Sequence, residues 1–199
     1  MTTPAAEGEI QWREAARGDR ALVQGFTCCE PPPRSPLGRP MPHPRPYEWE
    51  VQAFLRHQKP PVGGESRLVL GTSDELLRAM FVLSRQPVYE GVGYVKLQAI
   101  AVSLEDRRKG GLLADQTLTR ALVHCFNLAA AEDVDRVRVV AWVDPQNEPS
   151  KRMLHRAGFG LVKLVGAGLE DWQLELHATS DGREIRSAEP LEKGSDTLN

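Results

Sequence analysis

Residues 100–113 read Ile100-Ala101-Val102-Ser103-Leu104-Glu105-Asp106-Arg107-Arg108-Lys109-Gly110-Gly111-Leu112-Leu113. A strand-like apolar pattern ends here, a short basic turn with two glycines follows, and a helical apolar pattern begins. The first N–H groups of a helix have no partner within the helix and carry the positive end of its dipole. Glycines let the backbone approach an anion closely, and Arg107, Arg108 and Lys109 add positive charge. The turn therefore predicts a pyrophosphate-binding site.

Two common nucleotide-binding motifs do not fit this turn. No Gly-Lys-Ser or Gly-Lys-Thr follows it, which excludes a P-loop. No Gly-x-Gly-x-x-Gly occurs either, which excludes the dinucleotide-binding fingerprint.

Composition narrows the class of protein further. A chain of 199 residues with 41% hydrophobic and 26% charged residues suits one globular domain. A formal net charge of −2 makes a nucleic-acid partner unlikely on electrostatic grounds. No apolar run reaches the roughly 18 residues of a membrane span, and the first residues do not resemble a secretory signal. The cysteines Cys28, Cys29 and Cys125 form no disulfide framework, and no metal-ligand spacing appears. We therefore expect a cytoplasmic protein without membrane contact or a bound metal.

Hydrophobic periodicity elsewhere predicts an α/β fold. Strands are expected over residues 9–14, 67–72, 76–84, 91–102, 134–143, 159–165 and 172–176, and helices over 17–24, 47–57, 111–131 and 147–157. This order predicts a mixed, mostly antiparallel sheet with helices on both faces.

Two segments depart from regular structure. Residues 31–46 contain eight prolines and are expected to form an extended loop that covers Trp49. That loop could be a stiff connector, a lid over a substrate or a docking site for a proline-binding module. Residues 178–199 are expected to be a disordered tail because they carry few large apolar side chains.

The basic turn resembles the acyl-CoA-binding motif of the GNAT superfamily of N-acetyltransferases, Gln/Arg-x-x-Gly-x-Gly/Ala. Arg107 takes the first place and Gly110 the fourth, whereas Leu112 departs from the pattern. The run Asn-Glu-Pro-Ser-Lys-Arg-Met-Leu-His-Arg-Ala-Gly-Phe at residues 147–159 is similar to the family's Asn-x-x-Ser/Ala-x-x-Leu-Tyr-x-x-Leu-Gly-Phe helix. The order of elements over residues 8–177 also follows the family. The resemblance implies the GNAT acyl-CoA N-acyltransferase fold, in one domain over residues 1–177.

The resemblance also implies acetyl-CoA as co-substrate and a set of residues that would bind it. The strand end would offer backbone groups to the pantetheine arm and the thioester carbonyl, the basic turn would hold the pyrophosphate through its amides, and the helix after Asn147 would flank the pantetheine. The residues implied are Ile100, Ala101, Val102, Arg107, Arg108, Lys109, Gly110, Gly111, Leu112, Asn147, Ser150 and His155.

Both proton-transfer positions of the family carry other residues. Lys96 stands where many members have a Glu base, and Leu154 where they have a Tyr acid. Glu48 and Glu50 are candidate replacement bases, and the alternative is that both are ordinary solvated carboxylates. They flank a helix whose buried face is expected to hold Tyr47, Val51, Phe54 and Leu55. His155 follows the acid position, but its side chain is expected to point elsewhere.

The resemblance implies an enzyme that transfers an acetyl or short acyl group from acyl-CoA to a primary amine, on a small molecule or a protein. The alternative is a non-catalytic acyl-CoA-binding module with a regulatory or interaction role on the same fold. A homodimer through the sheet edges is also considered, because such edges often form dimer contacts in this fold.

Overall fold

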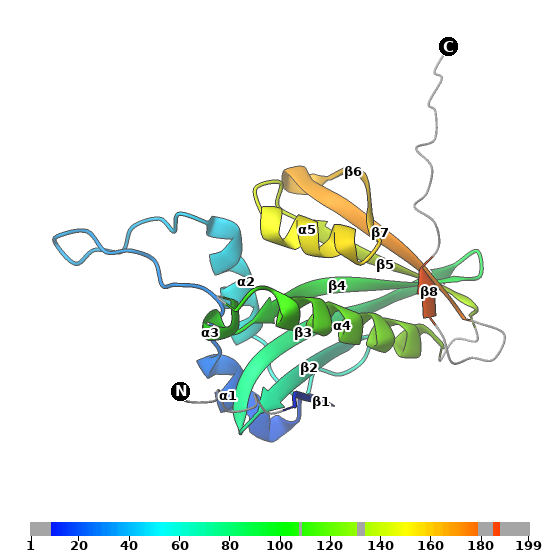
Figure 1. The fold of residues 1–199 in the computed structure, drawn as a ribbon, viewed down its shortest axis with the longest axis horizontal. Coiled ribbons are helices and arrows are strands. Elements are labelled where there is room, and N and C mark those ends of the chain that lie inside the picture. The colour runs from blue at the N-terminus through cyan, green and yellow to red at the C-terminus, as the bar shows by residue number, and fades with distance from the viewer. Residues whose placement is uncertain (1–8, 108, 131–133, 179–184, 188–199) are drawn as a thin grey trace, which may run out of the picture. The chain divides into compact units, whose positions relative to one another are not determined.

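The computed structural model describes residues 9–107, 109–130, 134–178 and 185–187 (Figure 1). The strands are β1 Gln11–Glu14, β2 Ser66–Ser73, β3 Leu76–Tyr89, β4 Val92–Val102, β5 Arg136–Val143, β6 Gly160–Val165, β7 Leu169–Ala178 and β8 Ile185–Ser187. The helices are α1 Arg20–Gly25, α2 Pro46–Arg56, α3 Leu104–Arg107, α4 Leu112–Ala130 and α5 Glu148–Arg156, with 3-10 turns η1 Arg17–Asp19 and η2 Gly166–Gly168.

The strands form one sheet in the order β1-β2-β3-β4-β5-β7-β6, with β8 paired to β7. β4 and β5 are parallel, whereas β1–β2, β5–β7, β6–β7 and β7–β8 are antiparallel. The parallel pair follows from the crossover through α4, because parallel neighbours need a long connection. The predicted α/β fold with a mixed, mostly antiparallel sheet is therefore confirmed.

The chain divides into two compact units. The first comprises Met1–Val82 and Ala99–Thr117, and the second comprises Leu83–Gln98 and Leu118–Asn199. Strands β3 and β4 and helix α4 each continue from one unit into the other. The single domain over residues 1–177 stays a prediction.

The first unit is held together by apolar side chains from several of its elements. Val23, Phe26, Leu55, Leu70 and Met80 are among the buried residues of this cluster. Burial of one such side chain contributes about 1.5–3 kcal/mol. The cluster fixes α1, α2 and the first strands around the segment that leads to α3.

The second unit has a regular alternating core. Alternate residues of β5, from Val137 to Val143, are buried, and so are Leu174 and Leu176 on the neighbouring β7. Helix α4 comes very close to β4 at Gly93, where an added Cβ would lie 2.9 Å from the Cβ of Ala129. Only glycine allows this approach.

The structure corrects two predictions of local structure. Helix α3 was not predicted, because its four residues lie in the run that was expected to be a turn. Local hydrogen bonds to the Ser103 carbonyl form it, and Leu104 N and the Asp106 carboxylate also bind Thr27 and Arg78. Residues Ile185–Ser187, within the predicted disordered tail, form β8. The pairing of β6 with β7 ends at Gly160↔Gln173 and leaves the backbone of β7 beyond it without a β6 partner. Strand β8 pairs with β7 there, from Leu176 to Ala178, and so satisfies its main-chain groups. Residues 179–184 and 188–199 of that tail lie outside the described residues.

Candidate functional site

Two consecutive glycines shape the turn before α4. Gly110 has φ +92° and Gly111 has φ +84°, a conformation that side chains with a Cβ rarely adopt. A Cβ built on either residue would meet no atom within 4 Å, so the space above the turn is open. The turn leads into the 19-residue helix α4, whose dipole is positive at this end. These residues fit a phosphate group held by backbone amides.

The structure narrows the set of amides that could hold an anion. The N–H of Arg107 donates to the Ser103 carbonyl at 3.0 Å, and the N–H of Lys109 donates to the Asp106 carbonyl at 3.0 Å. These two amides are used by α3, which corrects the prediction that the whole run from Arg107 donates to pyrophosphate. Within the described part of the turn, the amides of Gly110, Gly111 and Leu112 have no acceptor. Arg108 lies outside the described residues.

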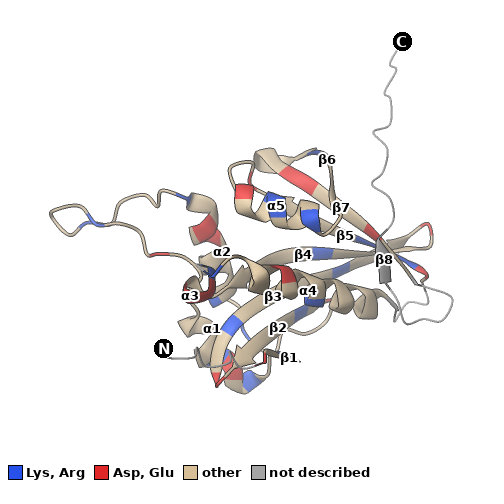
Figure 2. Cartoon of the chain, viewed as in Figure 1, with Lys and Arg blue, Asp and Glu red and all other residues tan. Residues whose placement is uncertain are grey.

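The Asp106 carboxylate is the electrostatic anchor of the turn. Asp106 is buried and accepts hydrogen bonds from Arg78 Nε at 2.7 Å and Ser103 Oγ at 2.6 Å, while Arg78 Nη2 binds its other oxygen. Lys109 Nζ lies 3.3 Å from Oδ1. Burial opposes the charged form, but these hydrogen bonds outweigh it and lower the pKa of Asp106 to about 2. Figure 2 shows both signs of charge at α3.

Glu48 and Arg107 form a second ion pair beside this anchor. Arg107 Nη2 donates to Glu48 Oε1 at 2.7 Å, and Arg107 Nη1 donates to the Cys28 carbonyl at 2.7 Å. Arg45 Nη1 lies 3.2 Å from the same Glu48 oxygen, and only 5% of the Glu48 side chain is exposed. The Arg107 guanidinium is therefore engaged with protein groups rather than directed at a ligand.

This pair also corrects the reading of α2. Its buried residues are Glu48, Gln52 and Leu55, whereas Phe54, expected in the buried face, is 38% exposed. Gln52 faces inward because the backbone satisfies it: its side chain accepts from Cys28 N at 2.6 Å and donates to the Phe26 carbonyl at 2.6 Å. Glu48 faces inward because Arg107 and Arg45 bind it. Glu48 is thus neither a solvated carboxylate nor one that is open to an acceptor. Glu50 is exposed on the same helix.

The cysteines beside this network are poor nucleophiles. Cys28 and Cys29 are both buried, and burial raises the pKa of the Cys28 thiol to about 12. The thiolate is the reactive form of cysteine, so this environment suppresses nucleophilic chemistry.

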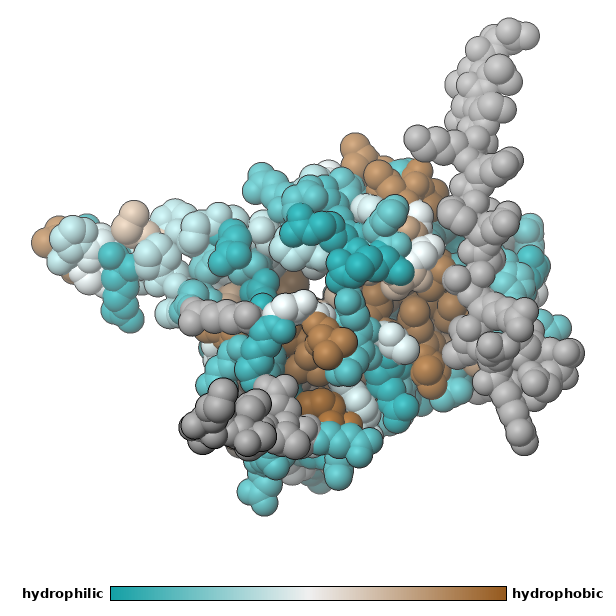
Figure 3. Space-filling view, in the orientation of Figure 1, coloured by the Kyte–Doolittle hydropathy of each residue, from teal (hydrophilic) through white to brown (hydrophobic). Residues whose placement is uncertain are grey.

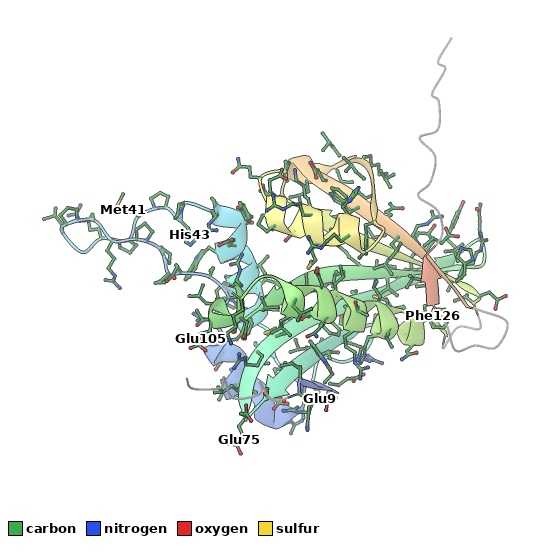
Figure 4. The ribbon with its side chains drawn as sticks, viewed as in Figure 1. Glu9, Met41, His43, Glu75, Glu105 and Phe126 are labelled. Atoms are coloured by element: carbon green, nitrogen blue, oxygen red, sulfur yellow. The ribbon has the colours of Figure 1, made fainter. Side chains whose placement is uncertain are left out.

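The proline-rich segment forms an arm that extends from the N-terminal end of α2 (Figure 1). Ser35 N donates to the Arg39 carbonyl at 2.8 Å and Met41 N to the Pro33 carbonyl at 2.9 Å, so the arm folds back on itself. At its base lies His43 (Figure 4), whose Nε2 is 3.0 Å from the Glu30 carbonyl. The His43 ring stacks on Trp49, the residue that the sequence expected this segment to cover. Leu37 is 82% exposed at the turn of the arm, where Figure 3 shows hydrophobic surface.

The end of β4 extends beyond its pairing with β5. The β4–β5 ladder runs from Val92↔Arg136 to Leu97↔Ala141, and β4 continues past it to Val102. Ile100 and Ala101 are partly buried and Val102 is buried. This is the strand end that the sequence indicated as a thioester-binding segment.

Helix α5, in the second unit, begins at the predicted asparagine. Asn147 Oδ1 caps the helix by accepting from Ser150 N at 3.3 Å, so its carbonyl oxygen is used internally and its amide nitrogen remains as a donor. Leu154 is buried with 2% exposure, whereas His155 is exposed. The two residues point in different directions, as the sequence predicted for His155.

Lys96 lies on β4 in the second unit, against a tryptophan. Its Nζ is 3.1 Å from the centroid of the Trp142 ring. A cation over an indole face is stabilised by about 0.5–2 kcal/mol. Sequence reasoning identified Lys96 only as a departure from a pattern, and no sequence signal indicated Trp142.

Comparison with solved structures gives the fold a name. An acetyltransferase of the GNAT family from Desulfovibrio desulfuricans matches with a TM-score of 0.53 and 18% identity, over 84% of this chain and 98% of that chain. The PaiA N-acetyltransferase from Thermoplasma acidophilum, solved with coenzyme A, matches with a TM-score of 0.50 and 10% identity, over 82% and 97%. The chain has the GNAT fold.

Another structure with this GNAT fold comes from a KacTA–DNA complex, with a TM-score of 0.54 and 16% identity over 83% of this chain and 93% of that chain. No protein-family model and no curated protein matches the sequence. Within the described residues, no group of three or more His, Cys, Asp or Glu side chains could hold a metal, and no helix is long and apolar enough to cross a membrane. That nucleic acid is not a partner stays a prediction.

Proposed function

We propose that this protein is an acetyl-CoA-dependent N-acetyltransferase that moves an acetyl or short acyl group to a primary amine. The observation that carries the proposal is the open Gly110-Gly111 turn at the positive end of a 19-residue helix. The two adjacent glycines with positive φ leave backbone amides and open space for a pyrophosphate group. In addition, a solved structure with this fold contains bound coenzyme A.

Different residues of the chain would bind different parts of acetyl-CoA. The amides of Gly110, Gly111 and Leu112 would hold the pyrophosphate. Acetyl-CoA supplies the activated thioester carbonyl. A backbone N–H from Ile100 to Val102 would donate to the carbonyl oxygen as negative charge develops there, a contribution of about 3–4 kcal/mol in comparable sites.

The thiol leaving group needs little help from an acid, whereas the acceptor amine needs a group that removes its proton. A thiol with an ordinary pKa of about 8.5 leaves with little help from an acid, which is compatible with Leu154 at the acid position. A primary amine must lose a proton before it attacks. Of the two carboxylates on α2, only Glu50 is exposed, because Glu48 is bound to Arg107 and Arg45. The proposal therefore gives proton acceptance to Glu50.

Release of free thiol distinguishes the enzyme from a non-catalytic acyl-CoA-binding module. We expect acetyl-CoA with a panel of primary amines to release thiol above the rate of background hydrolysis. Mass spectrometry should find one acetyl group on the amine for each thiol released. Binding of acetyl-CoA without turnover on the whole panel would instead indicate the module, which the fold comparisons do not favour.

Separate replacement of each of the two carboxylates on α2 by glutamine tests which one accepts the proton. Glu50→Gln is expected to lower kcat by roughly 10²–10⁴-fold, the usual contribution of a general base. Glu48→Gln is the matched control: it weakens the contact with Arg107 and should lower the free energy of unfolding by about 1–3 kcal/mol, with a smaller effect on kcat. Steady-state rates and urea unfolding of both variants give the comparison. Wild-type kcat in Glu50→Gln would show that solvent removes the proton.

The residue at position 154 predicts the shape of the pH profile. An enzyme that relies on a phenol as acid loses activity when that phenol ionises near pH 10. Leu154 cannot ionise, so kcat should rise with pH as the acceptor amine becomes neutral and then stay level. The measurement is kcat from about pH 6 to about pH 10.5 with both substrates saturating and with folding monitored in parallel. A descending alkaline limb in folded protein would mean that another acid operates, and Tyr94 or Tyr89 would be the first to replace.

A further inference from the structure

Three side chains on one face of the second unit's sheet form a cluster that the proposed function does not use. Lys96 on β4 is paired with Val140 on β5, and Trp142, two residues further along β5, is paired with Asp171 on β7. Side chains alternate along each strand, so Lys96, Trp142 and Asp171 all lie on the same face. The buried residues of β5, such as Val139 and Ala141, lie on the other face.

The Lys96 ammonium is held in place without an oxygen partner. Its Nζ lies over the Trp142 ring, and in the described parts of the chain no carboxylate or carbonyl oxygen lies within hydrogen-bond distance of it. An ammonium carries three N–H donors, and an indole face satisfies none of them as an oxygen would. Burial lowers the pKa of Lys96, and the negative charge of Asp171 works against that shift. The side chain therefore offers hydrogen-bond donors that are already oriented.

Asp171 supports the cation from a distance. It is 3% exposed, and its Oδ2 accepts from Gln173 Nε2 at 2.9 Å. Its Oδ1 is buried and has no hydrogen-bond partner among the described residues. A carboxylate in this position favours the charged form of Lys96 through space while leaving its N–H groups free. The pair differs from an ordinary salt bridge, in which the donors are consumed.

Two other cations on this face, Arg136 and Arg138, are already paired. Arg138 Nη2 donates to Glu175 Oε2 at 2.7 Å, and Arg136 Nη1 lies 3.7 Å from Glu175 Oε1. Beside the unsatisfied Lys96, the Trp142 side chain is 47% exposed and offers apolar surface to a ligand. The combination is complementary to a small molecule with an anionic group next to an aliphatic one.

We propose that Lys96 and Trp142 form a binding site for a small aliphatic carboxylate. Lys96 donates to the carboxylate, and Trp142 packs against the aliphatic part. A polyamine would meet like-charge repulsion at the same place.

Binding of a small aliphatic carboxylate tests this inference without requiring turnover. N-acetylleucine and N-acetylleucinamide differ only in the charged carboxylate, and calorimetric titration of the whole protein compares them. We expect the acid to bind about 10–100-fold more tightly than the amide, as one charge-assisted hydrogen bond provides. In Lys96→Met the preference for the acid should disappear while the affinity for the amide changes little.

Two further variants control for folding and for charge. Lys96→Arg keeps the cation and should retain the preference for the acid, and Lys59→Met removes an exposed lysine of the first unit and should leave binding unchanged. Equal binding of acid and amide, no measurable binding of either, or an undiminished preference in Lys96→Met would each overturn the inference. If the acid binds through Lys96 but no amine is acetylated, the proposed enzyme activity fails and the carboxylate site stands.

Discussion

Gly110→Glu is expected to abolish the stabilisation of this protein by acetyl-CoA. A ligand that binds only the native state at 100 times its Kd adds about 2.7 kcal/mol to stability. In a chain of this size that corresponds to a rise of roughly 5–10 °C in melting temperature. The glutamate would place a carboxylate in the open space above the turn, where the phosphates are proposed to lie. Thermal unfolding with and without ligand measures the effect.

A second glycine of the same unit provides the matched control. Gly38, in the proline-rich arm, has φ +74° and equally open surroundings. Gly38→Glu therefore introduces the same backbone strain and the same charge at a distance in sequence from the turn. We expect its ligand-induced shift to equal that of the wild type, even if its own melting temperature falls. A full shift in Gly110→Glu would remove the turn from the binding site.

Asp106→Asn should be among the most destabilising single changes in the first unit. The substitution removes the buried carboxylate charge that Arg78 binds and that lies 3.3 Å from the ammonium of Lys109. Loss of one partner of a buried ion pair costs about 3–5 kcal/mol. Urea unfolding measures the loss, with Glu148→Gln as control. Glu148 pairs with Lys151 at 2.6 Å, but its side chain is 57% exposed, so we expect a change within about 1 kcal/mol.

The same carboxylate predicts how stability depends on pH. The folded-state pKa of Asp106 is about 2, below its ordinary value of 3.8. The unfolded state therefore binds a proton before the native state does, and the contribution of Asp106 is present above pH 3.8 and is lost as the pH falls through about 2. The difference in unfolding free energy between wild type and Asp106→Asn should narrow across this window. A difference that stays constant down to pH 2 would contradict the assignment.

The sequence by itself determined the order and type of the elements other than α3 and β8. Period-two runs such as 134–143 and period-3.6 runs such as 111–131 record which side of a strand or helix is buried, and that information is local. The glycine pair at 110 and 111 was equally readable, because positive φ favours a residue without a Cβ. The predicted site turn is thus a property of consecutive residues.

Tertiary structure alone decided what the charged side chains do. Glu48 is 59 positions from Arg107, and Asp106 is 28 positions from Arg78. No local pattern shows which of Glu48 and Glu50 will be bound to arginines and which will remain exposed. The same holds for Lys96 over Trp142, where strand pairing brings together residues from β4 and β5. Hydrophobic periodicity follows from burial of one face, whereas a charge takes its role from the partner that folding places beside it.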